Sequence, residues 1–160
     1  MKFELGDRVI YPHHGAAEIM AREQRNEFGE AREYLVLKTA HGDLTVKVPA
    51  DMVDEVGMRP PIDTDDVEDL FELLAKKDVR EPANWRRRFK NHQEKLKSGD
   101  IYQVAEVVRN LALRENAKGL SAGEKSMLEK SRQILVSELS ISMDVTEDEA
   151  RQQVELRLAG

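Results

Sequence analysis

The sequence predicts an α+β protein of two domains, in which a small N-terminal β-barrel precedes an all-α bundle of about five helices. Residues 1–59 contain short apolar runs with the two-residue period of strands. Residues 65–160 show helical spacing and capping signals instead. Between them, R-P-P-I-D-T-D-D carries two prolines and several acids, so we place a linker at residues 60–64.

The strand region consists of apolar runs separated by turn signals. The run at residues 3–11 ends at Pro12 and H-H-G, and a shorter run covers residues 16–21. R-N-E-F-G-E is typical of a hairpin connection around Gly29, ahead of the strong strand Y-L-V-L-K-T at residues 34–39. A turn is predicted at A-H-G-D, residues 40–43.

The alternation in L-T-V-K-V-P, residues 44–49, assigns a face to each side chain. Leu44, Val46 and Val48 share one face, and Lys47 points to the other, towards solvent. Residues 53–58 are predicted to add a last short strand. About five short strands in so few residues favour a small barrel, because closure removes exposed sheet edges.

Five helices follow, each with a start signal or an apolar stripe. Thr64 is predicted to cap the first, and Pro82 suits the first position of the second, which ends near residue 98. The third spans residues 100–116, and the last two begin at the capping boxes Ser121–Glu124 and Thr146–Glu149. Apolar residues seven apart, at 127, 134 and 141, indicate a core stripe rather than a dimerising zipper, so we expect a monomer.

Composition excludes several classes of protein. The chain of 160 residues has no cysteine, so disulfides and thiolate metal sites are ruled out. No apolar stretch reaches the ~20 residues of a membrane span, and the first residues do not resemble a signal peptide. Glycine-rich phosphate loops and H-E-x-x-H are missing, and the histidines do not cluster. We expect a cytoplasmic protein that is not an enzyme and needs no metal or cofactor.

Charge is distributed unevenly along this acidic chain, whose net charge is −6. Residues 54–81 carry four basic and ten acidic side chains, whereas residues 82–118 carry nine basic and four acidic ones. The local net charge therefore changes from −6 to +5 at one boundary. Because phosphate binding depends on local potential, the basic segment is a candidate nucleic-acid surface.

The only tryptophan, Trp85, stands at the start of this basic segment, in E-P-A-N-W-R-R-R-F-K. On a helix it shares a stripe with Phe89, His92 and Leu96, which favours a core position. Its place in the first turn, beside several arginines, favours instead an aromatic that projects from the helix end towards a nucleic acid. Both interpretations remain open from periodicity alone.

Several strings in this chain resemble one family, in order and at matching spacing. They are G-D-x-V-x-Y-P-x-H-G at residues 6–15, E-Y-L-V-L-K at 33–38, G-D-L-T-V-K-V-P at 42–49, N-W-R-R-R-F-K at 84–90, A-E-V-V-R at 105–109 and G-L-S-A-G-E-K at 119–125. Together they resemble the CarD family of bacterial transcription regulators. The resemblance weakens after about residue 140.

The resemblance implies a Tudor-like domain at residues 1–59 that binds the β subunit of RNA polymerase, a module similar to one in the transcription-repair coupling factor. Arg25 and Lys47 would carry that contact. Lys47 stands where we expect an arginine, which keeps the charge but loses the bidentate fork. Such proteins look like global regulators that act with the housekeeping sigma factor.

The resemblance also implies a helical domain at residues 65–160 that contacts promoter DNA at the upstream edge of the melted region and stabilises the open complex. Trp85 would be a minor-groove wedge with little base specificity. Lys90 and Lys125 would contact DNA, and Arg86, where a small polar residue is expected, would add a phosphate contact. Arg87 and Arg88 would give electrostatic support.

One alternative function is a barrel-type peptide reader or adaptor with a helical dimerisation module. The aromatic residues of the first domain, Phe3, Tyr11, Phe28 and Tyr34, could form a methyl-lysine cage, although in so small a domain they more often form the core. A hydrolase has no supporting constellation of residues.

Overall fold

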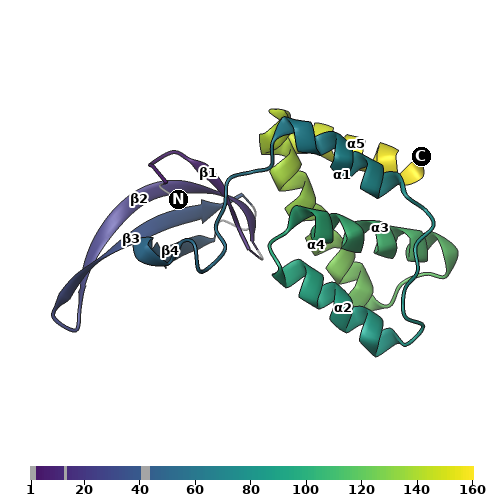
Figure 1. Cartoon of the computed structure of the whole chain (residues 1–160), viewed down its shortest axis with the longest axis horizontal. Coiled ribbons are helices and arrows are strands. Elements are labelled where there is room, and N and C mark those ends of the chain that lie inside the picture. The colour runs from purple at the N-terminus through teal and green to yellow at the C-terminus, as the bar shows by residue number, and fades with distance from the viewer. Residues whose placement is uncertain (1–2, 13, 41–43) are drawn as a thin grey trace. The chain divides into compact units, whose positions relative to one another are not determined.

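A computed structural model describes residues 3–12, 14–40 and 44–160. The chain divides into two compact units, Met1–Pro61 and Ile62–Gly160, which we call the sheet unit and the helical unit (Figure 1). The predicted α+β fold class is confirmed. The predicted turn at residues 40–43, apart from Ala40, lies outside the described residues, as do His13 and His41.

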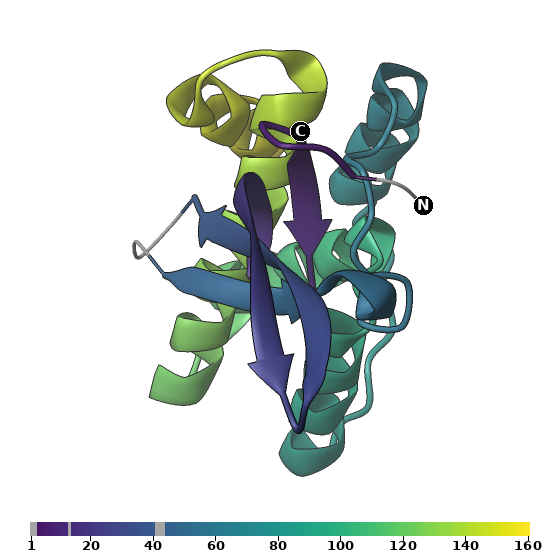
Figure 2. The ribbon, with the colours of Figure 1, turned by 90° about the vertical axis from the view of Figure 1, so that its left-hand side faces the viewer.

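The sheet unit is a curled antiparallel sheet of four strands in the order β1-β2-β3-β4 (Figure 2). These strands are β1 (Arg8–Tyr11), β2 (Gly15–Glu27), β3 (Glu30–Thr39) and β4 (Thr45–Pro49). One face buries the alternate apolar residues, because successive side chains of a strand point to opposite faces. The core consists of Phe3, Val9, Ala17, Ile19, Leu35, Leu37, Val48, Val53 and Met58.

The strand predicted at residues 53–58 is wrong. The chain forms instead a 3-10 helix, Ala50–Met52, followed by turns, in which Gly57 takes a φ of +82°. Val53 and Met58 are nevertheless buried in the sheet core. Their apolar character therefore marked burial correctly, but a turn rather than an extended strand brings them to the core.

A two-residue turn joins β2 and β3 into a long hairpin. Phe28 and Gly29 both have positive φ, +51° and +80°, as in the turns that match the twist of a hairpin. Gly29 takes this conformation at little steric cost, whereas Phe28 does not. Phe28 is also fully exposed at the hairpin tip.

The helical unit contains the five predicted helices among its described residues. They are α1 (Thr64–Ala75), α2 (Trp85–Lys97), α3 (Ile101–Ala117), α4 (Ala122–Met143) and α5 (Glu147–Ala159). Most of the apolar stripe on α4 is buried, so the prediction of a core stripe is confirmed. The helical core combines residues of α1, α3, α4 and α5. Its most buried members include Leu70, Leu74, Val107, Leu111, Leu135, Leu139 and Val154.

Two predicted helix starts are displaced. Asp63, not Thr64, is the N-cap of α1, and α2 begins at Trp85 rather than at Pro82. The side chain of Asn84 accepts a hydrogen bond from the backbone N–H of Arg87 and so starts α2. Asparagine is among the best N-cap residues, which explains why the helix begins after it.

The chain between the units is held on both sides. Arg59 exchanges two backbone hydrogen bonds with Ile10 in the sheet unit. The backbone N–H of Ile62 donates to Glu138 on α4, and Ser142 donates to the carbonyl of Ile62. Pro60 and Pro61 are thus the residues between these two anchors.

Candidate protein-binding face and nucleic-acid interface

The first candidate site is a basic patch on the sheet face opposite the core. Arg25 on β2 and Lys47 on β4 are both exposed there. Glu23 lies between them, 3.8 Å from Arg25 Nε and 3.1 Å from Lys47 Nζ. The two predicted polymerase-binding residues therefore come together around one carboxylate.

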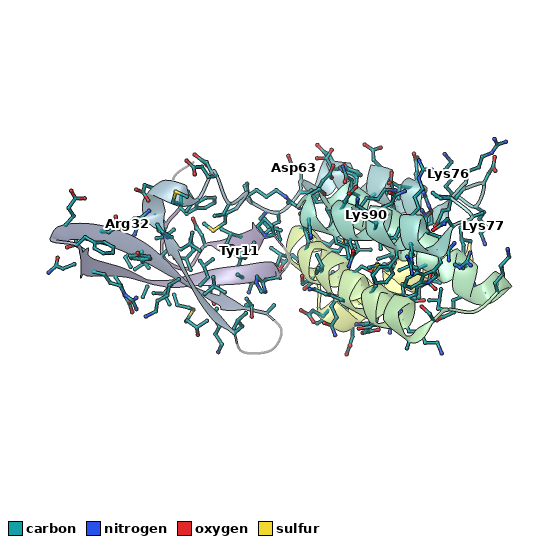
Figure 3. The ribbon with its side chains drawn as sticks, turned by 90° about the horizontal axis from the view of Figure 1, so that it is seen from below. Tyr11, Arg32, Asp63, Lys76, Lys77 and Lys90 are labelled. Carbon is teal, nitrogen blue, oxygen red and sulfur yellow. The ribbon has the colours of Figure 1, made fainter. Side chains whose placement is uncertain are left out.

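Tyr34 and Arg32 belong to the same patch, although the sequence singled out Tyr34 only for a methyl-lysine cage and did not single out Arg32. Strand pairing places Tyr34 opposite Glu23 and Arg32 opposite Arg25. The guanidinium carbons of Arg25 and Arg32 lie 5.6 and 5.9 Å from the centre of the Tyr34 ring, within the range of cation–π attraction. The hairpin register is the signal that would have found both residues. We call Glu23, Arg25, Arg32, Tyr34 and Lys47 the basic sheet face (Arg32 is labelled in Figure 3).

The four aromatic residues of the sheet unit do not line one cage. Phe3 is buried in the sheet core, and Tyr11 stacks on His14. Tyr34 lies on the basic sheet face, and Phe28 is exposed at the hairpin tip. A methyl-lysine cage needs aromatic rings that converge on one cation, and these rings are dispersed.

The second candidate site is formed where α2 and α4 begin. Trp85 is the first residue of α2, and 45% of its surface is exposed. Its ring stacks on Phe89, with centroids 5.0 Å apart, and its indole N–H donates to Glu124 Oε1 at 3.2 Å. Phe89 in turn packs against the helical core. Trp85 is therefore a half-exposed aromatic on a fixed base, not a core residue.

Exposed cations surround this aromatic tip. Arg86, Arg87 and Lys90 are exposed on α2, and Lys125 is exposed on α4, next to the glutamate that binds Trp85 (Lys90 is labelled in Figure 3). Close packing holds the two helix starts together, since a Cβ at Gly123 would lie 3.6 Å from the Phe89 ring. The structure thus gathers most of the predicted DNA-contacting side chains in one region. We call Trp85, Arg86, Arg87, Lys90 and Lys125 the Trp85 tip.

Arg88 departs from this set, because only 2% of its surface is exposed. Its Nη1 donates to the carbonyls of Pro82 and Ala83, and its Nε lies 3.6 Å from Glu124 Oε2. Arg88 lies four residues before the buried His92, so both side chains are on the inward face of α2. Arg88, which the sequence grouped with the DNA-contacting residues, is therefore not available at the surface.

Two further titratable groups, His92 and Glu81, extend the network around Arg88. His92 is buried, and its Nε2 lies 3.4 Å from Glu81 Oε2, which also lies 3.9 Å from Arg88 Nε. Burial alone would raise the pKa of Glu81. The pairing with His92 and the charges of His92, Arg88 and Lys95 outweigh that effect, so the pKa is lower than its ordinary value.

Glu81→Gln is expected to destabilise the helical unit at neutral pH but not in acid. Because the folded state lowers the pKa of Glu81, the ionised carboxylate stabilises the fold above its ordinary pKa of 4.5. That stabilisation is lost as the pH falls through the lower folded value. Urea unfolding of both proteins between about pH 7 and pH 3 should show their difference shrinking with acidity. Glu94→Gln, at an exposed position on α2, is the control, and a pH-independent Glu81→Gln difference would contradict this account.

No group of three or more potential metal ligands is found among the described residues. In the same part of the chain, no helix is both long and apolar enough to cross a membrane.

Comparison with known families matches both units separately. Residues 3–62 match the CarD-like/TRCF RID domain, and residues 69–155 match the C-terminal domain of CarD. The chain belongs to the CarD family. It is also 31% identical over 149 residues to YdeB of Bacillus subtilis (strain 168), which is named as a candidate transcription factor. That match covers 93% of this chain and 97% of YdeB.

Membership in the CarD family confirms the resemblance seen in the sequence motifs. It assigns this protein to transcription regulation. The family is of the transcription-factor type and is not a known enzyme family. The Trp85 tip belongs to the CarD C-terminal match, and the basic sheet face belongs to the RID match.

Proposed function

We propose that this CarD-family protein regulates transcription initiation by bridging RNA polymerase and promoter DNA. Its Tudor-like sheet unit binds the β subunit of the polymerase that carries the housekeeping sigma factor. Its helical unit contacts DNA at the upstream edge of the bubble and stabilises the open complex. The observation that carries the proposal is that each unit exposes its own candidate contact set, the basic sheet face in one and the Trp85 tip in the other.

The basic sheet face suits a protein partner with an acidic surface. Arg25 and Arg32 lie over the Tyr34 ring, and Lys47 adds a third cation beside Glu23. Two carboxylates oppose them, those of Glu23 and of Asp51, which pairs with Arg32 at 3.3 Å. Arginine is enriched at the centres of protein interfaces, and Tyr34, of whose surface only 9% is exposed, supports the guanidinium groups of Arg25 and Arg32. Lys47 holds its ammonium against Glu23 as a point charge, so it does not need the arginine fork to keep this position.

The Trp85 tip suits DNA that is already distorted. Apolar and aromatic side chains wedge between base steps in the minor groove, and nearby cations hold the phosphates. Arg86, Arg87, Lys90 and Lys125 are exposed to do so. Because few cations are involved, we expect weak binding to DNA alone, with little base specificity. The contact with polymerase raises the effective concentration of this tip at the promoter.

The energetic consequence is a shift in promoter melting. A protein that binds the open complex more tightly than the closed one favours opening by that difference in affinity. A difference of about 1.4 kcal/mol changes the equilibrium tenfold. We propose that the protein acts as a monomer, since one chain carries both contact sets.

Arg25→Glu is expected to abolish the association with RNA polymerase. The substitution places two carboxylates, at positions 23 and 25, on a face that we propose meets an acidic partner, and like charges across an interface cost several kcal/mol. Co-elution of the purified protein with polymerase holoenzyme on a sizing column measures the effect. Arg8→Glu, at an exposed position on β1, is the matched control.

Three outcomes are informative in that experiment. Loss of co-elution with Arg25→Glu but not with Arg8→Glu supports the proposed face. Equal loss with both variants indicates a diffuse charge effect and contradicts a defined site. Retention by Arg25→Glu of full association would show that polymerase binds elsewhere on the protein.

A further inference from the structure

Glu124 is a buried carboxylate at the start of α4 that connects several groups around the Trp85 tip. Only 3% of its surface is exposed. Its Oε1 accepts hydrogen bonds from the indole N–H of Trp85 at 3.2 Å and from the backbone N–H and hydroxyl of Ser121 at 3.2 and 3.1 Å. Its Oε2 lies 3.6 Å from Arg88 Nε and 3.8 Å from Arg114 Nε.

Helix capping accounts for only part of this arrangement. The capping box needs the reciprocal bonds between Ser121 and Glu124, and it has both. It does not need a contact with α2, yet the same carboxylate oxygen also accepts from Trp85. The two arginines balance the charge of Glu124 from its other oxygen. The capping box thus holds Glu124 in place at the start of α4, and Glu124 Oε1 also accepts a hydrogen bond from Trp85 on α2.

The indole of Trp85 is consequently restrained at two points. Stacking on Phe89 sets the plane of the ring, at 17° to the phenyl ring. Stacking alone lets an aromatic ring slide and turn in that plane, whereas a directional hydrogen bond at the ring nitrogen stops this motion. An ionised acceptor makes this bond stronger than a neutral one would.

Glu124 is ionised for a physical reason that the surroundings supply. Burial by itself would raise the pKa of this carboxyl. The hydrogen bonds from Ser121 and Trp85 and the charge of Arg88 outweigh burial, so its pKa lies below the ordinary value.

We propose that Glu124 is a positioning residue, which fixes the orientation of the Trp85 ring in advance of DNA binding. The inference rests on the proposed function, in which Trp85 contacts the edge of the melted region. Fixing the ring beforehand removes the entropy loss of ordering it during binding, so the tip binds more tightly without a new contact to DNA.

The same hydrogen bond also determines what Trp85 can recognise. Tryptophan has one polar group, the indole N–H, and Glu124 occupies it. Trp85 therefore presents no donor to the edge of a base while this bond is intact. Trp85 then acts on DNA by stacking and by shape alone. Low base specificity follows, because the ring offers no hydrogen bond that could distinguish one base from another.

A double-mutant cycle tests the proposal with intact protein, polymerase holoenzyme and a melted promoter. Trp85→Phe keeps an aromatic ring but removes the N–H, and Glu124→Gln keeps the shape of the acceptor but removes its charge. Each single variant is expected to shorten the open-complex lifetime about three- to tenfold, the range of one hydrogen bond. The double variant should be no worse than Trp85→Phe alone, because Glu124 acts through the N–H.

Fluorescence gives a second readout, because Trp85 is the only tryptophan in the chain. Glu124→Gln should lower the emission anisotropy of the free protein and increase quenching by acrylamide. Ser121→Ala removes two hydrogen bonds of the capping box, one to Glu124 Oε1 and one from the backbone N–H of Glu124, and is expected to lower the melting temperature. Glu129→Gln, at an exposed position on the same helix, should change neither the emission anisotropy nor the quenching by acrylamide.

The outcomes separate the positioning role from the proposed function. If Glu124→Gln shortens the lifetime as much in the Trp85→Phe background as in the wild type, Glu124 is merely structural and the proposal is overturned. An unchanged anisotropy in Glu124→Gln overturns it as well. If Trp85→Ala itself leaves the lifetime unchanged, the DNA contact proposed for Trp85 fails, whatever the anisotropy of the Glu124 variant shows.

Discussion

Arg88→Ala is expected to lower the free energy of unfolding of the helical unit by about 3 kcal/mol, the lower end of the range for breaking a buried ion pair. Arg88 is buried between Glu81 and Glu124, and its guanidinium also donates to two backbone carbonyls. Removing it takes the donor from both carbonyls and one cation from each carboxylate, which leaves His92 beside Glu81 and Arg114 beside Glu124. Urea unfolding followed by helical circular dichroism measures the loss.

The neighbouring arginine provides the control for this prediction. Arg87 is exposed, and Arg87→Ala should change the free energy of unfolding by no more than about 0.5 kcal/mol. When equal amounts of folded protein are compared, Arg87→Ala should weaken DNA binding more than Arg88→Ala does. Arg87 is expected to contact phosphate, whereas Arg88 affects DNA binding only through the stability of the fold. An Arg88→Ala protein that is as stable as wild type but defective on DNA would return Arg88 to the contact surface.

Trp85→Ala is expected to shorten the open-complex lifetime about tenfold, which corresponds to about 1.4 kcal/mol of lost preference for the open state. Because Trp85 is 45% exposed, the cost to folding should be about 1–2 kcal/mol, well below the 3–5 kcal/mol of a fully buried tryptophan. Association with polymerase should be unchanged, because the basic sheet face lies in the other unit. Promoter melting assays, thermal unfolding and co-elution measure the three quantities.

Trp85→Phe is the intermediate case, since it keeps a ring to stack on Phe89 and loses the bond to Glu124. Its lifetime should lie between those of the wild type and Trp85→Ala. A Trp85→Ala protein with a melting temperature lowered as far as that of a core variant would show that the ring is structural. An unchanged lifetime with intact polymerase binding would reject the wedge.

Periodicity predicted most elements because it reports local physics. The alternation around Lys47 indicated which side chains face solvent, and the structure has Val48 buried and Lys47 exposed. The capping box at Ser121 and Glu124 is present as predicted. The strand predicted at residues 53–58 failed because an apolar run indicates burial and does not by itself distinguish an extended strand from a turn that covers the core.

The candidate site was also predicted in part. Sequence motifs indicated Trp85, Lys90, Lys125, Arg25 and Lys47, and the structure exposes all five. They did not distinguish Arg87 from Arg88, because three consecutive arginines look alike in a charge count. They also missed Arg32 and the position of Tyr34 beside Arg25, because both depend on the hairpin register.

By itself, the sequence determined the fold class, the number of helices and, through ordered motifs, the CarD family, because these depend on local period, capping and residue identity. Only the tertiary structure decided the environment of each charge. Whether a cation is a contact or a buried pair depends on what another helix places against it. Glu124 lies thirty-nine positions from Trp85, yet it binds the indole and pairs with Arg88. No sequence pattern within α2 indicates that this carboxylate lies beside it.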